Sequence, residues 1–320
     1  MAQTICEAWV SRISSHRASS AQRTQYQRDL HATLAEITHN RGCIASETNE
    51  PQAALSHFTH FNAMMAAEFG ADGQLCRRDM RLAISWNELG NAHMLNSDWR
   101  RGEACFERSV ATMRQLAFFE EINLSLPVVN LGLSWWLQGR NEEALGLLLQ
   151  GLGERQKAFG SDDRESFITG RFLHALGNVK AAVGRREESL AFHRKALLHY
   201  KSTLGNNHHR TADVCVKVAE HSIRLKQEDT AMALLDHALK AYSNRETYVP
   251  EKARALFKRS QVLRMMRKAD EAEQVREEAA ELYYEAVGAD EKGVERKKAG
   301  ELVDEDFYEL IAFWSSLSSV

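Results

Sequence analysis

Pairs of small residues recur along this chain at a spacing that constrains its fold more than any other feature. In the stretch NLGLSWWLQGRNEEA (130–144), Gly132 and Ala144 lie twelve residues apart on either side of a turn at Gly139. Successive pairs begin 48, 42, 45, 42 and 41 residues apart, and periods of about 20–50 residues are typical of repeat proteins. The other five pairs are Gly42/Ala54, Gly90/Gly102, Gly177/Ser189, Ala219/Ala231 and Ser260/Ala272.

Apolar residues at helical spacing flank each of these turns, which predicts a hairpin of two helices in every unit. The chain has only 3 prolines in 320 residues, so few positions interrupt a helix. One hairpin cannot bury its own apolar faces, and neighbouring hairpins must therefore stack. The sequence predicts an all-α fold, an α-solenoid that forms a right-handed superhelix of about six helical hairpins.

The repeats divide the chain into three predicted parts. Residues 1–34 form an N-terminal helical segment, residues 35–288 the superhelical domain, and residues 289–320 a charged connector with a C-terminal helix. An amphipathic helix is expected there because apolar residues recur at helical spacing after three acidic residues; these are Phe307, Leu310, Ile311 and Trp314. We expect this helix to cap the exposed end of the last repeat, and the alternative is that it docks onto another protein.

Composition excludes several classes of function. The chain has 41 basic and 44 acidic residues, whereas general nucleic-acid binding requires a basic surface. Its 5 cysteines are scattered, so neither a disulfide framework nor a zinc site is expected, and a reduced, cytoplasmic setting fits better. No run of about 18 apolar residues predicts a membrane helix. The 13 histidines lack partners at metal-ligand spacing, and no metal or other cofactor is expected.

Catalytic motifs are also missing from the sequence. It contains no GxxxxGK[ST], GxGxxG, HExxH or GxSxG pattern, which would indicate phosphate binding, zinc proteolysis or acyl transfer. The acidic pair Glu142-Glu143 falls in the first turn of a predicted helix, where interaction with the helix dipole explains it. The sequence therefore favours a binding protein over an enzyme.

Several short motifs resemble tetratricopeptide repeats, namely Leu131-Gly132, Gly139-Arg140 and Glu143-Ala144-Leu145. The period near 42 and the connector Leu204–Thr211 resemble the kinesin-light-chain type of repeat, and the resemblance covers residues 35–288. Two residues depart from the pattern. His193 and Arg276 occupy positions where the second helix usually offers an apolar side chain, so they are either exposed or locally repacked.

The resemblance implies that the first helices line a concave groove and that the chain is a protein- or peptide-binding adaptor or scaffold. The lining residues would lie three positions before, and one or four positions after, the first small residue of each pair. Arg171 would lie just before His174 in the chain and on the same helix face. The implied groove residues are Asn87, Asn91, Met94, Val129, Leu133, Trp136, Arg171, His174, Asn178, Gln261 and Arg264, with Ala181, Val216, Glu220, Ile223 and Phe257 at the remaining positions.

Two other functions remain open. A closed superhelix could enclose a small molecule or act as an enzyme of unknown reaction, with His174 as the candidate for proton transfer. His174 would share one face with Arg171 and Asn178. Alternatively, the chain self-associates through Phe118-Phe119 or through the C-terminal helix.

Overall fold

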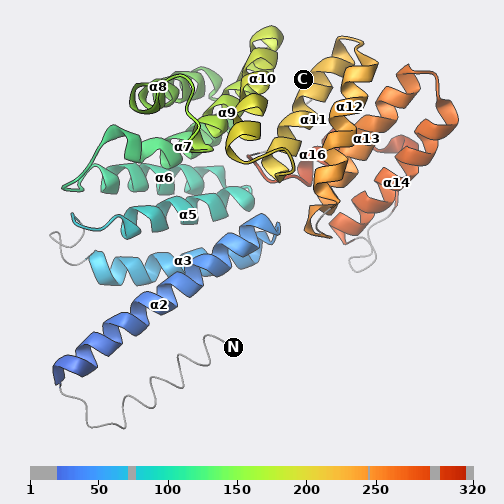
Figure 1. The fold of residues 1–320 in the computed structure, drawn as a ribbon. Helices are drawn as coiled ribbons and strands as arrows, with labels where there is room; N and C mark the ends of the chain where they lie inside the picture. Colours follow the sequence, from blue (N-terminus) through green and yellow to red (C-terminus); the bar gives the residue numbers. More distant parts are fainter. Residues whose placement is uncertain (1–19, 71–76, 244–245, 289–295, 315–320) are drawn as a thin grey trace. The chain divides into compact units, whose positions relative to one another are not determined.

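The computed structural model describes residues 20–70, 77–243, 246–288 and 296–314, and every regular element in these ranges is helical (Figure 1). This confirms the predicted all-α solenoid of helical hairpins. The chain divides into two compact units, Met1–Asn123 (unit 1) and Leu124–Val320 (unit 2). The C-terminal residues 296–314 belong to unit 2.

Unit 1 contains two hairpins, which pair α2 (Ser20–Glu47) with α3 (Pro51–Phe69) and α5 (Arg81–Leu95) with α6 (Trp99–Met113). α2 is continuous through the predicted boundary at residue 34. The core of unit 1 joins both hairpins. Phe58 and Met65 of α3 are fully buried, and Leu89 of α5 is buried beside them in the same cluster. A short 3-10 helix, η1 (Glu121–Leu124), follows.

Unit 2 contains four hairpins and the C-terminal segment. In chain order its elements are α7 (Ser125–Leu137), α8 (Asn141–Phe159), α9 (Ile168–Ala182), α10 (Arg186–Thr203), α11 (His209–Arg224), α12 (Glu228–Tyr242), η2 (Glu246–Tyr248), α13 (Val249–Met265), α14 (Ala269–Val287), η3 (Ala299–Glu301) and α16 (Asp304–Glu309). Each predicted pair of small residues falls with one member on the first helix of a hairpin and one on the second.

The hairpin turns share one conformational requirement. In all six, the residue two positions before the second helix has a positive φ, between 55° and 80°. This left-handed region strains most L-residues but not glycine. Glycine meets the requirement in two of the turns. The six residues are Asn49, Ser97, Gly139, Gly184, Lys226 and Arg267.

In the first four hairpins, a glycine of the first helix lies against the side chain sixteen positions later on the second helix. A Cβ on Gly42 would lie 2.6 Å from the Phe58 ring, and one on Gly132 would lie 2.7 Å from Leu148. Such distances are shorter than real Cβ contacts allow. Glycine at the first position therefore makes room for a large side chain at the second.

The two departures from the repeat pattern occupy this same packing position. His193, opposite Gly177, is fully buried, and Arg276, sixteen residues after Ser260, is also buried. The Arg276 guanidinium donates to the carbonyl oxygens of Ala299 and Leu302, both at 2.8 Å. Both positions are therefore locally repacked around polar groups and are not exposed.

The C-terminal helix is shorter than the sequence predicts, because α16 ends at Glu309. Its Phe307 stacks on Phe257 of α13, with ring centroids 4.4 Å apart. The chain is no longer helical after Leu310. The guanidinium carbon of Arg210 lies 5.6 Å from the centre of the Trp314 ring. The apolar residues are thus used in contacts with the first helices of unit 2.

A first prediction tests the close approach within a hairpin. Gly177→Ala would place a Cβ on the buried His193 ring, and overpacking of this kind costs about 1–3 kcal/mol of unfolding free energy. The matched control is Gly146→Ala on α8, where no atom lies within 4 Å of the added Cβ, and where we expect a gain of about 0.5–1 kcal/mol. Urea unfolding monitored by circular dichroism measures both changes. Equal effects of the two substitutions would contradict the packing argument.

Candidate functional site

Five charged side chains are buried on the first helices α11 and α13 of unit 2. We call them the charged cluster: Asp213, Lys217 and Glu220 on α11, and Arg254 and Lys258 on α13. Lys217 and Arg254 are each only 1% exposed. Buried charges of this kind must be paired and hydrogen-bonded, because taking them out of water is costly.

The cluster follows the repeat. Asp213 and Lys217 are four residues apart and share one face of α11, and Arg254 and Lys258 stand in the same relation on α13. The step from Asp213 to Arg254, and from Lys217 to Lys258, is 41 residues. Equivalent positions of two successive first helices therefore carry the cluster on one side of the stack, which we call the inner face.

Pairing within and between the last two hairpins satisfies part of the cluster. Arg254 contacts the Asp213 carboxylate at 3.3 Å, and the hydroxyl of Tyr242 donates to the same oxygen at 2.7 Å. Lys217 and Glu220 form an ion pair of 3.3 Å on α11. Burial lowers the pKa of Lys217 to about 8, although Glu220 opposes this shift.

The C-terminal segment completes the cluster. The hydroxyl of Tyr308 donates a hydrogen bond to Glu220, and the Lys217 ammonium lies 4.4 Å from the centre of the Tyr308 ring. Burial, together with Glu220, raises the pKa of Tyr308 well above its usual value, so the phenol stays protonated as a donor. Asp304 accepts from Lys258 at 2.8 Å and from Gln261 at 3.1 Å. α16 therefore covers the inner face with one carboxylate and one phenol.

A small pocket lies at the far end of the segment. Trp314 contacts a site whose other lining residues come from α7, α9, α10 and α11, and the enclosed volume is about 10 Å³, room for about one water molecule. The Nε2 atom of His174 is buried there without a hydrogen-bond partner among the described residues. The lining residues are Leu133, Arg171, His174, Ala175, Tyr200, Arg210 and Trp314.

The structure brings several of the implied groove residues together. Leu133, Arg171 and His174 share the pocket at Trp314. Gln261 and Glu220 bond Asp304 and Tyr308 of the C-terminal segment. These five residues belong to one continuous site within unit 2, although their roles in binding a ligand stay predictions.

Four other implied residues of unit 2 do not touch the C-terminal segment in this way. The side-chain oxygen of Asn178 lies 3.0 Å from His193 in the same hairpin, and Asn178 does not line the pocket at Trp314. Val129 and Trp136 are buried in α7. Arg264 is exposed and pairs with Glu273 at 2.9 Å.

The three implied residues of unit 1 lie on α5. The side-chain amides of Asn87 and Asn91 donate to Glu88, at 3.0 and 3.1 Å. Met94 is buried, and its sulfur packs at Gly102 of α6. Its side chain is thus part of the packing between the two helices of its hairpin.

Sequence reasoning did not identify most of the charged cluster. The implied groove positions lie three before and one or four after the first small residue of each pair. Asp213 and Arg254 lie six positions before that residue, and Lys217 and Lys258 lie two positions before it. A signal was available, since the charges recur four residues apart on one helix and again one repeat later. The charge pattern of one helix alone is compatible both with buried ion pairs and with a solvent-exposed face.

Buried histidines connect two hairpins behind the site. Nδ1 of His193 lies 3.1 Å from Nε2 of His221, which also lies 3.2 Å from the hydroxyl of Ser189. The His174 and His193 rings are 5.7 Å apart in an edge-on arrangement. Burial lowers the pKa of His174 to about 3 and that of His221 to about 4, and it lowers the pKa of His193 well below the usual value. All three rings are therefore neutral near pH 7.

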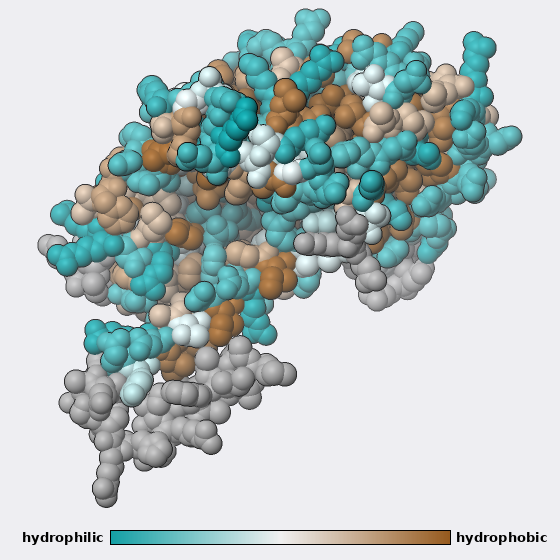
Figure 2. Space-filling model, viewed as in Figure 1, coloured by the Kyte–Doolittle hydropathy of each residue, from teal (hydrophilic) through white to brown (hydrophobic). Residues whose placement is uncertain are grey.

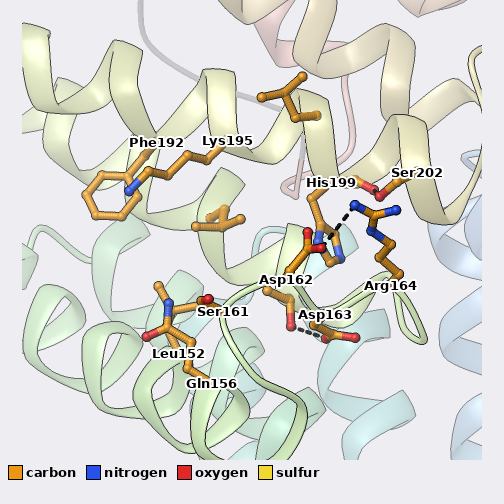
Figure 3. A pocket seen from close by; sticks show the side chains of 13 residues that line it. Leu152, Gln156, Ser161, Asp162, Asp163, Arg164, Phe192, Lys195, His199 and Ser202 are labelled. Atoms are coloured by element: carbon orange, nitrogen blue, oxygen red, sulfur yellow. Dashed lines mark hydrogen bonds and ion pairs between the residues drawn. The ribbon is translucent and has the colours of Figure 1, made fainter.

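A second, larger hollow lies between the second helices α8 and α10, on the other helix layer of unit 2. Figure 3 shows Phe192, Lys195 and His199 of α10 lining it, with Asp162 and Arg164 of the α8–α9 loop joined in an ion pair at the rim. Its volume is about 540 Å³. The hollow is open to solvent and shares no lining residue with the pocket at Trp314.

The described part of the chain contains no group of three or more His, Cys, Asp or Glu side chains placed to hold a metal ion. None of its helices is both long enough and apolar enough to cross a membrane. On the face of the molecule seen in Figure 2, hydrophilic side chains lie between hydrophobic ones over most of the coloured surface.

The family comparison decides the identity of the repeats. The profile of the tetratricopeptide repeat family matches residues 129–165 and 169–210, which correspond closely to the hairpins α7/α8 and α9/α10. These two hairpins are tetratricopeptide repeats. No curated protein matches the sequence.

Solved structures share the fold of this chain at low sequence identity. BtubC (BKLC) from P. vanneervenii is 16% identical, with a TM-score of 0.58 over 80% of this chain and 98% of its own. The nearly identical TPR-like repeats of a protein described as a kinesin light chain from Podosopora anserina are 17% identical, with a TM-score of 0.51 over 65% of this chain and 97% of their own. These likenesses support the predicted kinesin-light-chain-like type of repeat.

A further structural relative is known with a bound peptide. The Rap conjugation gene regulator of the plasmid pLS20, in complex with the Phr* peptide, is 12% identical to this chain. Its TM-score is 0.53, over 88% of this chain and 75% of its own. At this identity the likeness shows a common fold.

The buried histidines predict that the protein loses stability in acid. Unfolded histidines have a pKa of about 6.5, and the folded values of His174 and His193 lie below that because burial disfavours the charged ring. The unfolded state therefore binds more protons below pH 6.5, and stability is lost as the pH falls from there toward the folded values. We expect each of these two rings to cost up to about 2 kcal/mol at pH 5.

Thermal unfolding followed by circular dichroism between pH 7.5 and 5 measures this loss. The His193→Gln variant should show a shallower dependence of Tm on pH, because one buried titrating ring is gone. The control is His237→Gln, at the surface of α12, where the ring bonds the Asn206 carbonyl, and its pH profile should match the wild type. A His193→Gln profile as steep as the wild type would contradict the assignment.

Proposed function

We propose that the inner face of unit 2 binds a peptide or protein segment and that the chain acts as a protein-binding scaffold. The observation that carries the proposal is the charged cluster, because side chains of another segment contact Lys217 and Lys258 there. Asp304 and Tyr308 are those side chains. A surface that accepts a short segment through charge-assisted hydrogen bonds is chemically suited to peptide recognition.

Two further points support this proposal. The Rap regulator with the same fold binds the Phr* peptide, so stacked hairpins of this kind can serve as a peptide receptor. Rigid first helices also present their side chains before the ligand arrives. The receptor then loses little conformational entropy on binding.

The structure favours a peptide over a small-molecule substrate at this site. The space enclosed beside His174 is about 10 Å³, whereas pockets for small ligands are about 300–1,000 Å³. His174 is also a poor proton donor near neutral pH, because burial lowers its pKa to about 3. An enzymatic role for His174 is therefore not proposed.

Selection of peptides from a random library on the full-length protein tests the proposed function. Peptides retained by the wild type should bind Lys217→Met/Lys258→Met at least about tenfold more weakly, since each loses a charge-assisted contact. The control is Lys157→Met/Lys201→Met, which makes the same change of charge at exposed lysines of α8 and α10, and its affinities should match the wild type. Fluorescence anisotropy gives the dissociation constants.

Equal affinities for the wild type and the Lys217→Met/Lys258→Met variant would overturn the assignment of the inner face. Circular dichroism establishes that each variant is folded. The outer hollow at Phe192 and His199 would then become the site to test.

A further inference from the structure

We propose that residues 304–314 are a built-in ligand of the inner face and that the external partner is a helical peptide with the same recognition groups. Those groups are a carboxylate, a phenyl ring three residues later and a phenol one residue after that. The inference rests on the proposed function, since it names the partner and the regulation of that same site. Docking of the chain's own segment and binding of the partner are mutually exclusive.

The first argument is the geometry of α16. Asp304 and Tyr308 are four residues apart, so one helical face presents the carboxylate and the phenol together. Asp304 reaches Lys258 and Gln261 of α13, while Tyr308 reaches Glu220 of α11. A single helical turn therefore bridges two successive repeats, which is a mode of recognition open to any helix with the same side chains.

Aromatic contacts add specificity to this turn. Phe307 stacks on Phe257 with an angle of 24° between the rings. The Tyr308 ring lies between two cations, 4.4 Å from the Lys217 ammonium and 5.4 Å from that of Lys258. Cation–π contacts of this kind favour an aromatic ring over an aliphatic side chain at the same place.

Only part of the charged cluster is paired among the hairpins, where Asp213 bonds Arg254 and Tyr242 and Glu220 pairs with Lys217. Close packing within the last two hairpins is made at small positions, where Ala219 and Ala231, and Ser260 and Ala272, are fully buried. Lys217 and Lys258 lie two residues before the leading small residues. Their charges serve contacts with Asp304 and Tyr308, which a partner can replace.

The free energy that holds residues 304–314 in the docked state is small enough for a competing ligand to replace them. Desolvation of a buried ion pair offsets most of its attraction, so Lys258–Asp304 stabilises the docked state only modestly. α16 has six residues, far fewer than an isolated helix needs to be stable, so it keeps its shape through its contacts with α11 and α13. A competing ligand can therefore shift the balance between docked and undocked states.

A second set of contacts keeps the segment close when it undocks. Arg276 of α14 holds the carbonyls of Ala299 and Leu302, and the hydroxyl of Tyr284 donates to the Lys297 carbonyl at 2.9 Å. None of these bonds involves the charged cluster. Residues 304–314 thus remain at a high effective concentration beside the inner face, which lowers the apparent affinity for an external peptide.

A fluorescein-labelled synthetic peptide of residues 302–314, LVDEDFYELIAFW, tests the inference on the full-length protein. Tyr308→Phe in the protein removes one hydroxyl from the competing segment and leaves Glu220 and Lys217 in place. We expect it to raise the affinity for the peptide about tenfold, because a hydrogen bond to a charged group is lost from the docked state. The same Tyr308→Phe change in the peptide should lower its affinity about tenfold.

The matched control is Tyr248→Phe in the protein. It removes another hydroxyl that contacts α11, where it lies 3.0 Å from Nδ1 of His209 and outside the charged cluster, and it should leave the peptide affinity unchanged. Asp304→Asn serves as a second variant should Tyr308→Phe fail to fold, and it should also strengthen peptide binding. Opposite effects of one substitution in the two partners are the signature of competition.

Three results would overturn the inference: no binding of the peptide to the wild type or to Tyr308→Phe, weaker binding to Tyr308→Phe than to the wild type, or an equal gain for Tyr248→Phe. If library peptides still require Lys217 and Lys258, the proposed function stands while this inference fails. Undiminished binding of the 302–314 peptide after Lys217→Met/Lys258→Met would place its site elsewhere and reject this inference, whereas the library peptides decide the proposed function.

Discussion

The structure depends on the side chain that lies sixteen positions after the first small residue of each hairpin, and in the first four hairpins this side chain packs against a glycine of the partner helix. In several hairpins that side chain is apolar, as in Phe58 against Gly42, and the contact only fills space. In the fourth hairpin it is His193, which meets His221 of the next hairpin. In the sixth it is Arg276, which holds the start of the C-terminal segment. One packing position therefore also joins neighbouring hairpins and positions residues 299–302.

The charged cluster is stabilised by pairing of its charges and not by close packing. Groups such as Arg254 and Lys217 would destabilise the fold if they were buried alone. They are tolerated because Asp213, Glu220 and Tyr242 satisfy part of their charge and hydrogen-bonding capacity, and because α16 supplies the rest. Paired buried charges contribute little net stability but are selective about what pairs with them. Selectivity with modest affinity suits a surface that exchanges one segment for another.

Much of the fold could be predicted from the sequence, and part of the site. The twelve-residue spacing located all six hairpins, because close helix packing requires small side chains at regular positions. Leu133, Arg171 and His174 were expected on one face and do meet at the pocket of Trp314. Asn178 was expected there too, but it turns toward His193, since a side chain near a helix edge can serve either neighbour. The sequence did not indicate that Lys217 and Arg254 are buried, because charged residues on a single helix usually lie on its solvent-exposed face.

The sequence by itself determined the period, the hairpins and their small residues, because these follow from contacts between residues close in the chain. It also contained the two polar departures, His193 and Arg276, without revealing their partners. Only the tertiary structure decided where the C-terminal segment lies. Tyr308 meets Glu220 across 88 residues of sequence, and no local periodicity records a pairing at that distance. The physical reason is that the folded stack must exist before its inner face can select the segment that covers it.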